Sequence, residues 1–228
     1  MPHRRWLGGF LLRQVWLLLA FVISVPAGWL TWRVVSPSAN GPRPAKPFIE
    51  KQPVVFARRS FDPVYPPSDM PPLGEGEEAE CDSNFISDAN VSGRMRKIDS
   101  GNATVTVAQV SVTLQLKITI WVPNGATQHV IEHEQGHRRI SEHYYAAADQ
   151  LAAEIAASYM GRRIAVSGSD LGAEARNALA QLSKEIAAEY NRRLNPDPAQ
   201  RRFDDLTDHN RNDRDAQEAV AQAIQETM

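Results

Sequence analysis

Cysteine and excess positive charge are the two features that this sequence lacks most clearly. Cys81 is the only cysteine among 228 residues, so no internal disulfide and no paired sulfur ligands for a structural zinc ion are available. The formal net charge is -2 and the sequence pI is about 6.3. A chain without a broad cationic surface is poorly suited to neutralising phosphates, which argues against nucleic acid as a partner.

Charged residues are also missing from one long stretch near the N-terminus, residues 14–32. As a helix this stretch would span roughly 28 Å, close to the hydrocarbon thickness of a bilayer. Basic residues precede it and place the N-terminus in the cytoplasm. We therefore expect a transmembrane signal anchor over residues 1–35, with the rest of the chain outside the cytoplasm. The alternative is a cleaved signal peptide ending near Val25-Pro26-Ala27, which would export the domain equally.

Proline and small residues dominate the segment that follows, residues 36–80. This composition predicts an extended linker between the anchor and a folded domain over residues 81–228. Within the linker, Phe48 to Tyr65 contains enough apolar residues that part of it could pack as an extra strand.

Apolar and polar residues alternate in the region between Asn84 and Val122. From Val110 onward an apolar residue stands at every second position, which is the period of a strand. Asp99-Ser100-Gly101-Asn102 has the composition of a turn. These features predict a small antiparallel sheet.

Beyond Gly125 the spacing of apolar residues becomes helical. Apolar residues recur every three or four positions, so a first long helix should end at about Met160. Ser169-Asp170 can cap a second helix that ends at Asn195-Pro196 and packs antiparallel to the first. Residues 203–215 read as a polar loop, and a short helix is expected at 216–227. The fold class is therefore α+β.

Candidate chemistry lies in the run His133-Glu134-Gln135-Gly136-His137, near the start of the first predicted helix. Histidines four residues apart project from one helix face and can bind the same Zn²⁺ ion. Glu134, beside the first ligand, is placed to contact a water on the metal as a general base.

A histidine-rich solvated helix face is the alternative interpretation of this run. Gly136 argues against it, because glycine costs about 1 kcal/mol relative to alanine inside a helix. Close approach of another backbone is the more natural reason for a glycine there.

A catalytic zinc site usually has three protein ligands, so a third must come from elsewhere in the chain. His209 is the best candidate, since it is the one histidine downstream of the first helix. Asp204 and Asp208 are alternatives, either as the ligand or as carboxylates that hold His209. For the oxyanion donor, four side chains near the motif are weak candidates: Arg138, His143, Tyr144 and Tyr145.

Two separated segments, Glu132 to His137 and Phe203 to His209, resemble a bacterial family of unknown-function domains described as predicted zinc-dependent proteases. That family bears His-Glu-x-Gly-His on a helix and, later, Tyr-Asp-x-x-Thr-x-His-Gly. The resemblance implies a zincin-like site with His133, His137 and His209 as ligands and Glu134 as the base. This chain departs from the pattern at Phe203, where the family tends to have tyrosine, and at Asn210, where it tends to have glycine.

Motif and resemblance together predict a zinc-dependent metallopeptidase that acts on a protein or peptide substrate. The bacterial family and the N-terminal anchor place it in the inner membrane, with its C-terminal domain in the periplasm. A membrane-tethered binding or scaffold module with a structural zinc is the main alternative. An amidase acting on cell-wall peptides would share the same site chemistry.

Overall fold

The computed structural model describes residues 46–74 and 76–228. The signal anchor expected at residues 1–35 lies outside these residues. Within them, none of the helices combines the length and the apolar character needed to cross a membrane.

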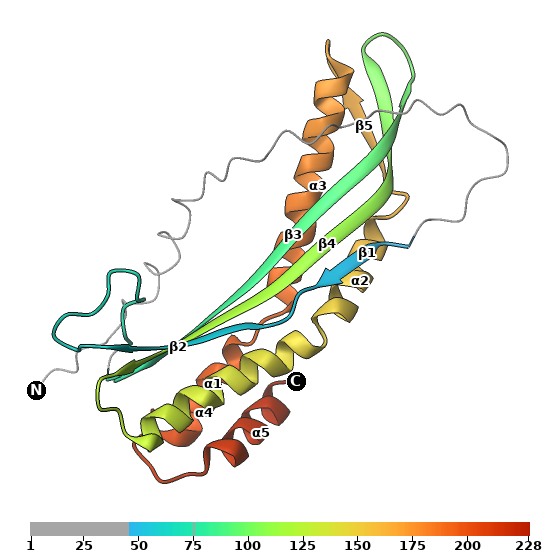
Figure 1. Ribbon diagram of the computed structural model, residues 1–228. Helices are drawn as coiled ribbons and strands as arrows, with labels where there is room; N and C mark the ends of the chain where they lie inside the picture. The colour runs from blue at the N-terminus through green and yellow to red at the C-terminus, as the bar shows by residue number, and fades with distance from the viewer. Residues whose placement is uncertain (1–45, 75) are drawn as a thin grey trace, which may run out of the picture. The chain divides into compact units, whose positions relative to one another are not determined.

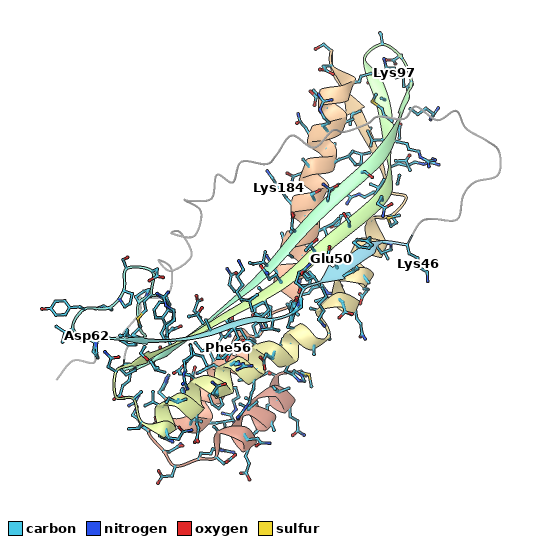
Figure 2. The ribbon with its side chains drawn as sticks, in the orientation of Figure 1. Lys46, Glu50, Phe56, Asp62, Lys97 and Lys184 are labelled. Atoms are coloured by element: carbon cyan, nitrogen blue, oxygen red, sulfur yellow. The ribbon has the colours of Figure 1, made fainter. Side chains whose placement is uncertain are left out.

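The sheet is organised around one long central strand, β4 (Asn102–Pro123). β3 (Glu80–Lys97) pairs with it in antiparallel orientation along almost its whole length, with the predicted turn between them. Lys97 marks the end of β3 at the tip of this hairpin (Figure 2). The hairpin predicted from the alternating pattern is therefore confirmed.

The opposite edge of β4 is covered by three short strands in succession. β5 (Arg163–Ser167) pairs with it antiparallel, whereas β1 (Phe48–Lys51) and β2 (Val55–Phe61) pair with it parallel. The prediction of a small antiparallel sheet is thus wrong, because the sheet has five strands and its pairing is mixed. β1 and β2 lie on one edge of β4, and β3 lies on the other. The chain passes from β2 to β3 through residues 62–79 and returns in β4, so β4 runs in the same direction as β1 and β2. The extra strand considered for the proline-rich segment is confirmed, as two strands.

The two faces of β4 differ in polarity, as its alternating sequence requires. Six apolar side chains on one face are at most 1% exposed: Val110, Val112, Leu114, Leu116, Ile118 and Ile120. The residues between them are polar and half-buried or exposed. The apolar face packs against the helices, so the helix that bears the histidines lies on this side of the sheet (Figure 1).

The first predicted helix is present, but it is divided at Ala147 into α1 (Gln128–Ala146) and α2 (Ala148–Tyr159). Lys51 of β1 holds the division in place. Its Nζ donates to the carbonyl oxygen of Ala146 at 2.6 Å and pairs with Asp149 at 3.0 Å. The break therefore depends on a strand about 100 residues earlier in the chain, which periodicity does not report.

α3 (Leu171–Arg193) begins at the predicted cap, where the Asp170 side chain accepts from the backbone N–H of Ala173. It packs along β3 and beside α2 (Figure 1). The predicted packing of this helix against the first long helix is confirmed for α2 but not for the histidine-bearing part, α1. The hairpin offers a longer apolar face than α1, and α3 covers that face instead.

The first residues of the segment expected to be a polar loop, 203–207, are helical, as the end of α4 (Asp197–Thr207). Residues 208–215 are not helical, as predicted, and the predicted terminal helix α5 (Ala216–Thr227) is confirmed. α4 has three apolar positions on one face, which pack against Ile140 of α1 and against α5: Ala199, Phe203 and Leu206. Its remaining surface is charged, which explains why it resembles a loop in the sequence. The same helix brings the later motif segment against α1.

Gly136 lies where α1 and α4 approach each other most closely. A Cβ at this position would be 2.8 and 3.0 Å from Cε1 and Cε2 of Phe203, and closer still to Cζ. Phe203 is fully buried, so its ring has no free space to move into. The close approach that the sequence suggested for Gly136 is therefore an aromatic side chain rather than a backbone.

We expect Gly136→Ala to destabilise the protein although alanine is the better helix former. The helical gain is about 1 kcal/mol, whereas overpacking of a closed core costs about 1–3 kcal/mol, and the clash here is severe. Urea unfolding measures the difference. Gly172→Ala in α3 is the matched control, because a Cβ there meets no ring but only the ends of the capping Asp170 and of Arg176, at 3.2 and 3.5 Å. Equal stability of the Gly136 variant and the parent would contradict this packing.

Candidate metal centre

α1 directs His133 and His137 toward α4, as their spacing of four residues requires. Their Nε2 atoms are 3.2 Å apart. The Phe203 ring stacks on His133 with centroids 4.9 Å apart and an interplanar angle of 25°. It meets His137 edge-on at the same centroid distance. One buried aromatic ring thus fixes the orientation of both imidazoles.

Asp204, the residue after Phe203, completes a group of three possible metal ligands. Its Oδ1 is 2.9 Å from Nε2 of His137 and 3.5 Å from Nε2 of His133. Ligand atoms bound at about 2.0–2.2 Å to a tetrahedral ion are about 3.3–3.6 Å apart. The three donor atoms are therefore spaced nearly as such an ion would require. We call His133, His137 and Asp204 the His-His-Asp centre, and it could hold a metal ion.

His209, the expected third ligand, does not belong to the His-His-Asp centre. It is exposed and lies in a left-handed turn, with positive φ angles of 48°, 51° and 67° at Asp208, His209 and Asn210. The helix α4 ends just before this turn, so Asp204 lies on the helix that packs against α1, whereas His209 lies beyond its end. The place expected for His209 is taken by Asp204, one of the two aspartates that the sequence left open.

Asn210 stands where the family that the sequence resembles tends to have glycine, and the backbone is compatible with either residue. A φ of 67° lies in the left-handed region, which favours glycine. Asparagine is one of the few other residues that adopt this conformation readily. The substitution therefore preserves the turn.

Two further polar side chains of α4 contact the far sides of the imidazoles. Gln200 Oε1 is 2.7 Å from Nδ1 of His137. The Thr207 hydroxyl is 3.4 Å from Nδ1 of His133 and donates to the carbonyl oxygen of Phe203 at 2.9 Å. Sequence reasoning missed both residues. Their only signal was the helical spacing of Gln200, Asp204 and Thr207, visible once α4 is known to be a helix.

Glu134 is buried beside the His-His-Asp centre but is not a member of it. Burial raises the pKa of its carboxyl to about 8, although the charge of His137 opposes this shift. In the described part of the chain no hydrogen bond to this carboxyl is found. The pKa of this carboxyl therefore lies near neutral pH, and its oxygens accept no hydrogen bond from the described residues. Such a carboxyl is able to exchange protons with water.

A shared proton stabilises the His-His-Asp centre of the metal-free chain. Burial favours a higher pKa for Asp204, but hydrogen bonds from His133 and His137 outweigh it and hold the Asp204 pKa well below its usual range. Burial alone would lower the pKa of His137, yet the Asp204 carboxylate raises it to about 9. Burial lowers the pKa of His133. A bound cation would take the place of the proton between His137 and Asp204.

The candidates for an oxyanion donor are engaged elsewhere. The Tyr145 hydroxyl lies 2.8 and 3.0 Å from the carbonyl oxygens of Gln52 and Leu114. Arg138 pairs with Glu142 at 2.8 Å and lies 3.9 Å over the ring of Phe56, the labelled residue of β2 in Figure 2. The other two candidates contact neighbouring side chains: His143 lies against Tyr144, and the Tyr144 hydroxyl is near the hydroxyl of Thr227.

Comparison of the chain with protein-family models, with curated proteins and with solved structures finds no match. The centre is therefore interpreted from its own geometry.

Asp204→Asn should weaken metal binding, because an amide keeps the size of the side chain but not its charge. We expect the affinity for Zn²⁺, measured by competition with a chelating dye, to fall at least about 10-fold. Asp205→Asn is the matched control, since Asp205 is exposed on the same helix. His209→Ala should also retain the parental affinity. Loss of binding in the His209 variant, with Asp204→Asn unaffected, would restore His209 as the third ligand.

Glu134 should destabilise the metal-free fold as pH rises. Its pKa moves from 4.5 to about 8 on folding, so between these values the unfolded state binds fewer protons than the folded state. The free energy of unfolding therefore falls across this window. Glu134→Gln removes the effect, and in chelator at pH 7.5 the variant should be more stable than the parent by about 1 kcal/mol or more. Urea unfolding at pH 4.5 should show little difference. A difference that is the same at both pH values would refute this burial cost, and the exposed Glu132→Gln serves as control.

Proposed function

We propose that this protein is a zinc-dependent peptidase in which Glu134 acts as the general base. The observation that carries the proposal is the spacing of the three donor atoms, 2.9, 3.2 and 3.5 Å, around one point. Two imidazoles and one carboxylate are a donor set of catalytic zinc, whereas structural zinc ions usually have four protein ligands. In the described residues only three such side chains converge here.

Access from solvent supports a catalytic rather than a structural role. The side chains of His137 and Asp204 are 16% and 18% exposed, while that of His133 is 9% exposed. The centre is therefore held in a buried contact between two helices, but its ligands are not fully closed off from solvent. That arrangement suits a ligand that must enter and leave.

Hydrolysis would require two roles from these residues, binding of the metal ion and transfer of a proton. A zinc ion held by His133, His137 and Asp204 would act as a Lewis acid and make its water more acidic. Glu134 would take a proton from the attacking water and pass it to the leaving amine. In the metal-free chain burial raises the pKa of Glu134 to about 8, and a bound Zn²⁺ would lower it toward the range in which the carboxylate can accept a proton near neutral pH.

The edge of β3 supports a peptide as the substrate. β3 pairs with β4 alone in the part of the chain that the structure describes, so no other described strand lies at its outer edge. Two of its side chains face α1 at the centre: Ser83 accepts from the Ser141 hydroxyl at 2.9 Å, and Cys81 has its thiol pKa raised by burial and then by the charge of Glu134. An extended peptide added to this edge would run past Glu134. Export of the domain, which rests on residues 1–35, stays a prediction.

Glu134→Gln and His133→Ala separate a catalytic from a structural metal. Glu134→Gln should fold, keep about one Zn²⁺ per chain and lose hydrolysis of a mixed peptide library by about 10²- to 10⁴-fold. His133→Ala should lose the metal. Metal content and peptide cleavage measured on the same preparations check both results.

Other outcomes would change the assignment. If Glu134→Gln matched the parent and His133→Ala unfolded, the zinc would be structural and the peptidase proposal would fail. Peptides methylated on backbone nitrogens next to the cleaved bond should be poorer substrates if the β3 edge binds them. Cleavage of cell-wall peptides but not of linear ones would assign an amidase.

A further inference from the structure

Gln200 is the side chain most fully engaged with a single member of the His-His-Asp centre. From α4 its Oε1 lies 2.7 Å from Nδ1 of His137. Its Nε2 donates to the backbone carbonyl of the same residue at 3.1 Å and to the hydroxyl of Ser141 at 3.0 Å. Every hydrogen-bonding end of this amide has a partner on α1.

These contacts determine which way the amide faces. A backbone carbonyl can only accept, so the end of Gln200 that meets the carbonyl of His137 must be the NH₂ group. The carbonyl oxygen of the amide therefore faces Nδ1, and Nδ1 must carry a hydrogen to donate to it. With Nδ1 occupied, Nε2 is the ring nitrogen that can bind a metal ion. Nε2 is also the atom that points toward Asp204.

We infer that Gln200 is the positioning residue of the metal centre, which fixes the tautomer and the orientation of His137. The inference rests on the proposed function, since it assumes that His137 binds the ion through Nε2. The linkage continues beyond α1, because the fully buried Ser141 also donates to Ser83 of β3 at 2.9 Å. The metal ligand is thereby connected to the strand whose edge is proposed to hold the substrate.

Among the described residues, the second histidine has no equivalent partner. The Thr207 hydroxyl is 3.4 Å from Nδ1 of His133, and its hydrogen is directed to the carbonyl of Phe203 at 2.9 Å. His133 is held mainly by stacking on Phe203. The loss of Gln200 should therefore affect the centre more than the loss of the Thr207 hydroxyl.

The test compares two substitutions that both lose the bonds donated by the NH₂ group, of which only one can accept a hydrogen bond from Nδ1. Gln200→Leu cannot accept it, and we expect the affinity for Zn²⁺ to fall by about 10- to 100-fold. Gln200→Glu can accept it, and should bind Zn²⁺ within a few-fold of the parent. Gln217→Leu, on the exposed surface of α5, is the control for a change from glutamine to leucine. A merely structural role would weaken both Gln200 variants alike.

A second measurement is independent of metal loading. The ¹⁵N chemical shifts of His137 in the metal-free parent, recorded above its pKa of about 9 so that the ring is neutral, should show the hydrogen on Nδ1. A neutral ring with its hydrogen on Nε2 would overturn the inference, even if Gln200→Leu failed to fold. Parental affinity in Gln200→Leu would overturn it as well. A parent that binds no Zn²⁺ but shows the Nδ1 hydrogen would instead contradict the proposed function and leave the role of Gln200 in orienting the ring intact.

Discussion

The close contact between Phe203 and Gly136 is the constraint on which the candidate site depends. The ring lies over Gly136, the one position of α1 that has no side chain. α4 therefore approaches α1 more closely than any other residue at position 136 would allow. In that position the ring touches both His133 and His137. The next residue, Asp204, is then placed beside the two imidazoles. One aromatic contact therefore brings two motifs together that lie about 70 residues apart.

The centre concentrates ionisable groups at a buried helix contact, which is costly unless each is paired. Asp204 meets this requirement through the two histidines, and His137 is further held by Gln200. Glu134 does not meet it, since burial raises its pKa and the described residues provide no hydrogen bond. Buried, unpaired ionisable groups lower the stability of a fold and are characteristic of functional sites. There the shifted pKa that activity requires is obtained at the expense of stability.

The long hairpin of β3 and β4 serves as the frame for this centre. Its apolar face supports α1, and the N-terminal half of β3 runs beside the helix that bears Glu134. α3 covers the hairpin farther along, and its backbone does not approach that of α1. The two parts of the fold thus have separate tasks: α3 and β5 stabilise the extended hairpin, while α1, α4 and α5 build the centre.

The sequence by itself determined what depends on neighbouring residues. The helix bearing His133 and His137, the turn before Asn102 and the cap at Asp170 all follow from spacing or from local hydrogen bonds, and all are present. Only the tertiary structure decided what depends on distant residues. These features are the parallel pairing of β1 and β2, the break at Ala147 and the choice of Asp204 over His209. α4 has a charged surface and only three buried apolar positions, so its pattern reads as a loop until α1 and α5 supply the surface against which it folds. Helix formation there is driven by packing rather than by local preference, and the third ligand depends on that packing.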